Sequence, residues 1–127
     1  MSTPFTFSGS LQFPPDAGLS QESIPVNFSS TYTQLATSKQ DLVSSGSKAV
    51  DFGGIASPGA KLVLVKVDAS STAAPVMLRW NSGSSSGQQE VAPGGFCVIG
   101  SGSPVAGLTA LTIVYTTNVT VRIWVLG

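Results

Sequence analysis

The chain has 127 residues, in which six Lys and Arg balance six Asp and Glu, and it contains no histidine. A protein that binds nucleic acid or an anionic membrane through charge carries an excess of basic residues, so this composition argues against both partners. The missing histidine excludes Ser–His and Cys–His nucleophiles. With a single cysteine, it also leaves no ligand set for structural zinc. We therefore expect no enzyme activity and no metal or other cofactor.

The first third of the chain is predicted to contain strands and loops. Apolar residues recur at every second position, which is typical of β-strands, and 14 Gly and 8 Pro interrupt the chain too often for long helices. Residues 5–13 and 24–32 are the first two predicted strands, and the segment TQLATSKQDLVSSGS is ambiguous, with room for a short strand around Leu42. Because residues 1–45 are less regular than the rest, we interpret them as an extended arm for assembly.

The remainder of the chain is predicted to be a series of short strands. The sequence KLVLVKVD (residues 61–68) is the strongest of them, and VMLRWNS (76–82) follows. QEVAPGGFCVIG predicts two strands joined at residues 93–95, and LTALTIVYTTNVTVRIWVLG predicts a closing hairpin that turns at residues 116–118. About eight to ten short strands with regularly spaced turns predict an all-β protein. We expect one antiparallel β-sandwich domain over residues 1–127, with jelly-roll-like topology.

Two of the predicted strands are apolar on both faces. Residues 61–68 place valines on one face and leucines on the other, and the last strand adds Trp124 and Leu126 to its second face. The outer face of a sandwich strand is usually polar, so the second apolar face must be covered. The cover is the N-terminal arm, loops of the same chain or another copy in a symmetric oligomer. The predicted oligomer or partner interface consists of Phe5, Phe7, Leu11, Phe13, Leu62, Leu64, Trp124 and Leu126.

The carboxylates and the cysteine do not predict a catalytic site. A glycosidase needs two carboxylates that face each other, but no two of the six stand two residues apart on one strand, and each fits a turn or a strand end. Cys97 lies in the apolar run GGFCVIG without a cationic neighbour, so we interpret it as a buried apolar side chain rather than a reactive thiol. The glycine-rich segment GSGSPVAG lacks the lysine of a phosphate-binding loop.

Arg79 and Trp80, in LRWNSG, are the most distinctive polar–aromatic pair in the sequence. Successive strand residues point to opposite faces, so the favoured interpretation places Trp80 in the core and Arg79 outside. An exposed Arg79–Trp80 pair is the alternative, because such a pair suits stacking on a sugar ring or on a partner's side chain. Trp124, Tyr32 and Tyr115 are further candidates for such contacts.

Four sequence features carry a resemblance to a known class of proteins: the strand KLVLVKVD, the turn PGGF, the strand GLTALTIVYTT and the terminal strand VTVRIWVLG. Over residues 45–127 the chain resembles the small β-rich virion proteins of tailed bacteriophages. The resemblance implies a non-enzymatic capsid decoration (cement) protein with a jelly-roll fold, located on the virion surface. Such a protein binds the major capsid protein or another virion protein as a homo-oligomer, with a trimer favoured. The alternative is a small tail, fibre or baseplate component with a receptor- or glycan-binding role.

Overall fold

The computed structural model describes residues 3–13, 22–56, 59–69, 74–82, 85–100 and 107–127. In these ranges the chain is almost entirely β-strand, with one short 3₁₀-helix, η1 (Gly53–Ala56). The chain divides into two compact units, Met1–Thr33 and Gln34–Gly127. The boundary falls within residues 1–45, the segment interpreted from the sequence as an extended arm, because residues 35–42 form a strand of the second unit.

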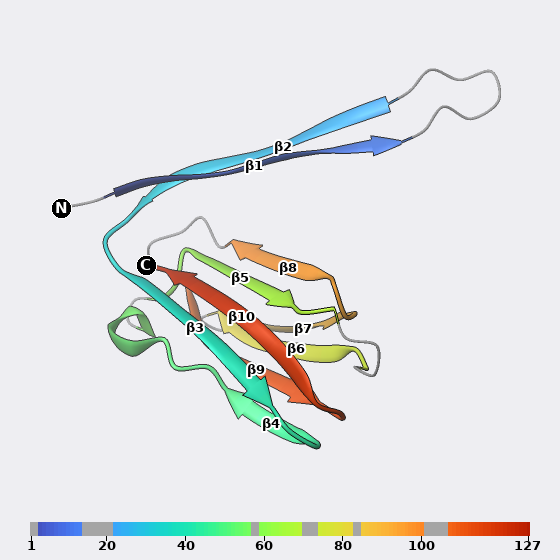
Figure 1. Ribbon diagram of the computed structural model, residues 1–127. Helices are drawn as coiled ribbons and strands as arrows, with labels where there is room; N and C mark the ends of the chain where they lie inside the picture. The colour runs from blue at the N-terminus through green and yellow to red at the C-terminus, as the bar shows by residue number, and fades with distance from the viewer. Residues whose placement is uncertain (1–2, 14–21, 57–58, 70–73, 83–84, 101–106) are drawn as a thin grey trace. The chain divides into compact units, whose positions relative to one another are not determined.

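The first unit is a β-hairpin. β1 (Thr3–Phe13) pairs antiparallel with β2 (Glu22–Tyr32) along its whole length, as the light and dark blue arrows of Figure 1 show. Near the chain start, the rings of Phe5 and Tyr32 lie with their centroids 5.9 Å apart at an angle of 58°, a tilted geometry that aromatic pairs prefer. Both predicted strands are confirmed. Because β2 occupies one edge of β1, the arm is a paired ribbon and not a single free strand.

The second unit is a β-sandwich of two four-stranded antiparallel sheets, and Figure 1 shows them as two layers. The first sheet has the order β3-β10-β5-β8, and the second has the order β4-β9-β6-β7. Their bounds are β3 (Leu35–Leu42), β4 (Gly46–Ala49), β5 (Leu62–Val67), β6 (Val76–Ser82), β7 (Ser85–Val91), β8 (Phe96–Gly100), β9 (Leu108–Tyr115) and β10 (Val119–Leu126).

The strand pairing defines the topology of the sandwich. β3 pairs with β10, β4 with β9, β5 with β8 and β6 with β7, so the first strand pairs with the last, the second with the second last, and so on inward. Pairing of β10 with β5 and of β9 with β6 joins these pairs into the two sheets. Two four-stranded sheets formed by such nested pairs define a jelly roll. The expected all-β, jelly-roll-like sandwich is therefore confirmed.

The core lies between the two sheets and follows the alternation in the sequence. The three valines of β5 and the alternate residues of β10 that begin at Val119 are buried, and they meet Leu78 and Ile113 of the other sheet. Burial of each such aliphatic side chain contributes about 1.5–3 kcal/mol to the free energy of folding. Cys97 packs against this core but is half-buried rather than fully buried, and burial raises the pKa of its thiol above the ordinary value.

The closing segment is not a hairpin. β9 and β10 belong to different sheets, so the turn at residues 116–118 carries the chain across the sandwich. The β3–β4 connection makes the same crossing, and the Ser44 backbone N–H donates a 2.7 Å hydrogen bond to Oδ1 of Asn118. The prediction was wrong because alternation shows which side chains face the core but not which strand lies alongside. β9 and β10 direct apolar side chains inward from opposite layers.

Candidate functional site

The outer face of the sheet β3-β10-β5-β8 is the most distinctive surface of the sandwich unit, and we call it the outer face. It carries the residues that alternate with the core residues, and the strand register arranges them in rows across the sheet. The first row consists of Leu35, Leu126, Leu62 and Gly100. The second row consists of Thr37, Trp124, Leu64 and Val98.

These two rows form an apolar patch, defined by Leu35, Leu62, Leu64, Val98, Trp124 and Leu126. Leu35 is 51% exposed, whereas Leu62 is only 6% exposed. The other four side chains are half-buried. Cross-strand pairs stabilise a sheet through direct side-chain contact, and Trp124 opposite Leu64 is such a pair. The patch therefore combines the second apolar faces of β5 and β10 into one surface.

A row of cations follows the apolar patch. Arg122 on β10 is directly opposite Lys39 on β3 and Lys66 on β5, so three neighbouring strands carry a positive charge at the same level. We call Lys39, Arg122 and Lys66 the cation row. It contains half of the six Lys and Arg of the chain. Like charges directly opposite in a sheet are destabilising.

Neighbouring acids neutralise this row only in part. Nε of Arg122 lies 3.7 Å from Oδ1 of Asp68, with both side chains well exposed to solvent, so this ion pair stabilises the fold little. Among the described residues, Lys39 and Lys66 have no ion pair. Asp41 lies one row further along β3 and accepts a 2.8 Å hydrogen bond from Oγ1 of Thr120. The cation row thus keeps an excess of positive charge next to an apolar surface.

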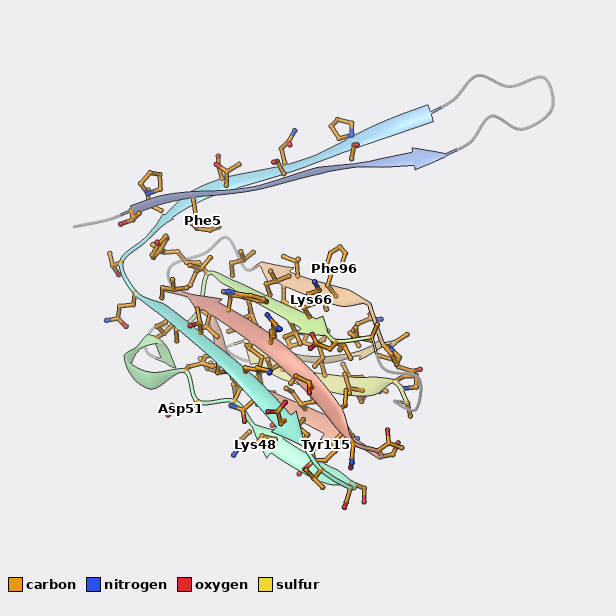
Figure 2. All side chains as sticks on the ribbon, viewed as in Figure 1. Phe5, Lys48, Asp51, Lys66, Phe96 and Tyr115 are labelled. Carbon is orange, nitrogen blue, oxygen red and sulfur yellow. The ribbon has the colours of Figure 1, made fainter. Side chains whose placement is uncertain are left out.

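The outer face is hollowed where the apolar patch meets the cation row. A shallow pocket of about 310 Å³ lies between β3 and β10, and it is lined by Thr37, Ser38, Lys39, Arg122, Ile123 and Trp124. At the far edge of the row, β8 places Phe96 opposite Lys66, and the Phe96 side chain is 63% exposed. Figure 2 labels both side chains on their neighbouring strands. The face therefore offers apolar and cationic contacts within one continuous region.

The outer face of the second sheet is different. Its cross-strand pairs on β6 and β7 are polar, with Arg79 opposite Gln88 and Asn81 opposite Ser86, and Arg79 is exposed. These four residues line a shallow pocket of about 390 Å³ together with Trp80 and Gly87. The two half-buried apolar side chains on this face, Met77 and Val114, are opposite each other. The sandwich unit is thus asymmetric, because one outer face has an apolar patch and a cation row and the other is mainly polar.

Trp80 is oriented toward the core, as expected from its place next to Arg79. Its indole packs partly buried against the core cluster. It lies over Gly87, its partner on β7, where an added Cβ would stand 2.5 Å from the indole Cζ2. The indole also lines the pocket of the second sheet, but its packing against the core leaves only part of the ring exposed there.

The predicted interface residues fall into three groups. Leu64, Trp124 and Leu126 lie together in the apolar patch, where part of each side chain reaches solvent. Leu62 lies in the same patch but is only 6% exposed, so it packs beneath its neighbours. Phe5 belongs to the hairpin and is half-buried. The side chains of Phe7, Leu11 and Phe13 lie outside the described residues.

Sequence reasoning missed five residues of the outer face: Leu35, Lys39, Lys66, Phe96 and Val98. The first two lie on β3, which the sequence left ambiguous because its alternation is interrupted by Ser, Gln and Asp. The alternation of β5 places Lys66 on the same face as Leu62 and Leu64, so that residue had a signal in the sequence. Only the register shows that Lys66, Arg122 and Lys39 lie side by side.

Neither a scan against protein-family models nor searches of curated proteins and solved structures found a match to this chain. Within the described ranges, no helix is long and apolar enough to cross a membrane. The same ranges contain no group of three or more His, Cys, Asp or Glu side chains placed to hold a metal ion. A pocket of about 400 Å³ lies beside Asp41 and Asp68, and these are the two carboxylates among its eight lining residues.

Proposed function

We propose that this chain is a structural protein of a tailed-bacteriophage virion, most specifically a capsid decoration (cement) protein that binds and stabilises the outer shell as a homo-oligomer. The observation that carries the proposal is the asymmetry of the sandwich, with an apolar patch and a cation row on one outer face and polar residues on the other. A decoration protein needs such an asymmetry, because one side binds the particle and the other meets solvent. The sequence resemblance over residues 45–127 supports the same class.

The proposed mechanism is multivalent. Each sandwich contributes one adhesive face of modest size, and a symmetric homo-oligomer, with a trimer favoured, presents several such faces at once. Linking the sites makes each further contact intramolecular, so that weak individual contacts sum to a high avidity. The shell is stabilised because each oligomer connects neighbouring capsid subunits.

The alternative is a small tail, fibre or baseplate component with a receptor- or glycan-binding role. One observation favours it: the pocket of about 390 Å³ on the second sheet is lined by Arg79, Asn81, Ser86 and Gln88, whose side chains suit hydrogen bonds to a sugar. The orientation of Trp80 toward the core weakens this version, because sugar sites commonly use an exposed aromatic ring.

Immunogold labelling of intact particles, with an antibody against this chain, tests the proposal. Dense label over the heads is the expected result. Label confined to tails would refute the decoration role and favour the alternative, and a glycan array with an Arg79→Ala variant would follow. Absence of label from intact and disrupted particles would refute both virion functions.

A further inference from the structure

The outer face places apolar and cationic groups in a fixed order along the strands. The apolar patch occupies the first two rows, at the end where β10 finishes, and the cation row occupies the third. Asp41 follows in the fourth row, and Asp68 comes directly after β5. A partner that covers this face must therefore place apolar groups over the first two rows and negative charge over the third.

A second copy of the same face does not match this order. In a face-to-face dimer the two-fold axis lies parallel to the sheet. With that axis perpendicular to the strands, the two apolar patches can cover each other, but then each cation row projects beyond the end of the other patch. With the axis along the strands, each cation row would lie on the cation row of the other copy. If the axis instead places each cation row on the acids of the other copy, both apolar patches extend past the partner's sheet. A face-to-face dimer therefore satisfies the apolar patch or the charges but not both.

A nucleic acid matches the face no better. Phosphates would be attracted to Lys39, Arg122 and Lys66, but Asp41 and Asp68 in the next row repel the same backbone. The half-buried Leu64, Trp124 and Val98 of the apolar patch would also be left without apolar contacts. The matching partner is a protein surface that carries apolar side chains beside carboxylates.

From this geometry, we propose that the outer face binds an extended, acid-bearing segment on the surface of the shell protein. Apolar side chains of the segment cover Trp124, Leu64 and Val98, and an acidic side chain of the segment enters the cation row of Lys39, Arg122 and Lys66. Successive rows are two residues apart, roughly 7 Å along a strand. The segment therefore presents an apolar residue and an acidic residue on one face at positions i and i+2. This inference rests on the proposed decoration function and specifies the chemistry of its partner.

The cation row gives this partner its specificity. Oppositely charged rows on two surfaces fix the register of binding and reject partners with like charge. The like charges of Lys39, Arg122 and Lys66 destabilise the free sheet and are relieved when carboxylates arrive. The hollow between β3 and β10, where Trp124 adjoins Lys39, places the apolar contact next to the first ion pair.

The test uses the full-length chain and shells from which this protein has been stripped, with binding measured by co-sedimentation. One variant combines Lys39→Glu with Lys66→Glu. The matched control combines Lys48→Glu with Arg79→Glu, which gives the same change of net charge at two exposed positions of the second sheet. Unfolding curves check that both variants fold like the wild type. We expect the first variant to bind at least ~10-fold more weakly, and the control to bind within about twofold of wild type.

The possible outcomes separate the two proposals. Wild-type binding that neither variant changes, or that both change equally, would overturn the inference and leave the decoration function standing. A wild-type chain that does not bind shells would overturn both. Sedimentation velocity of the free proteins adds one more outcome: if the Lys39→Glu/Lys66→Glu variant changes the oligomeric state and not the shell binding, the occupant is a second copy and the inference fails.

Discussion

Two glycines hold the sheets of the sandwich close together at one end, and the substitution Gly107→Ala tests their role. A Cβ added at Gly107 would lie 2.6 Å from the carbonyl carbon of Gly59 and 2.9 Å from the carbonyl oxygen of Ala60. Both atoms belong to the backbone, so no rotation of a side chain relieves the contact. The strain falls on the bridge next to it, where Ala60 and Leu108 exchange hydrogen bonds of 2.7 and 3.0 Å.

The expected cost follows from these contacts. Loss of the two backbone hydrogen bonds costs about 2 kcal/mol of the free energy of unfolding, and the forced displacement of packed backbone adds about 1–3 kcal/mol. Alanine restricts the unfolded chain more than glycine does, which returns about 0.4–1 kcal/mol. We expect Gly107→Ala to lower the free energy of unfolding by about 2–5 kcal/mol. For a unit of this size, the loss lowers Tm by at least ~8 °C.

Urea unfolding followed by tryptophan fluorescence measures this loss, because both tryptophans, Trp80 and Trp124, lie in the sandwich unit. Gly100→Ala is the matched control. A Cβ there would meet the Cδ1 atom of Leu62 at 3.4 Å and the backbone oxygen of Lys61 at 3.8 Å, both ordinary contacts, so the control should be as stable as the wild type. If Gly107→Ala unfolds at the same urea concentration as Gly100→Ala, the close approach of Gly107 to Gly59 is not a constraint on the fold and the reasoning is refuted.

Three further predictions concern other parts of the chain. Gly87→Ala should displace the indole of Trp80 and lower the free energy of unfolding by about 1–3 kcal/mol. In urea unfolding, the same substitution should cost much less when it is made in a Trp80→Leu background. An equal cost in both backgrounds would contradict the assigned contact. Burial raises the pKa of Cys97, so the folded state holds the thiol proton more tightly than the unfolded chain. Stability should therefore fall as the pH rises through the ordinary thiol range, and alkylation by iodoacetamide should be slower than that of glutathione; Cys97→Ala should remove the pH dependence. Deletion of residues 2–33 should leave the sandwich folded, because its buried core lies between Leu42 and Val125. If the hairpin is an arm that binds the shell, as the proposed function expects, the truncated chain should lose shell binding in co-sedimentation. Unchanged binding would exclude that role.

Much of the fold was accessible from the sequence, because local alternation has a direct physical cause. A strand that buries one side must carry apolar residues at every second position, and the segments KLVLVKVD and VTVRIWVLG do so without ambiguity. The inward orientation of Trp80 and the outward orientation of Arg79 followed from the same rule, and both are confirmed. β3 was ambiguous because it is an edge strand with mostly polar and small residues, so little of its pattern is fixed by burial.

The strand neighbours were not accessible in this way. β9 and β10 follow each other in the chain, are both apolar and are joined by a short turn, which favours a hairpin, yet they lie in opposite sheets. The pairing partner of a strand depends on contacts between residues far apart in the sequence, such as Val119 with Leu42. No period within one segment carries that information.

The sequence by itself therefore determined the all-β class, the faces that enter the core and the presence of two strands with a second apolar side. Only the tertiary structure decided that these second sides, from β5 and β10, form one patch and that Lys39, Arg122 and Lys66 lie in one row beside it. The physical reason is that alternation is a local property of each strand, whereas a surface is formed by register between strands. A shift of one residue in that register would bring core residues of one strand beside outer residues of the next, and neither the patch nor the cation row would exist.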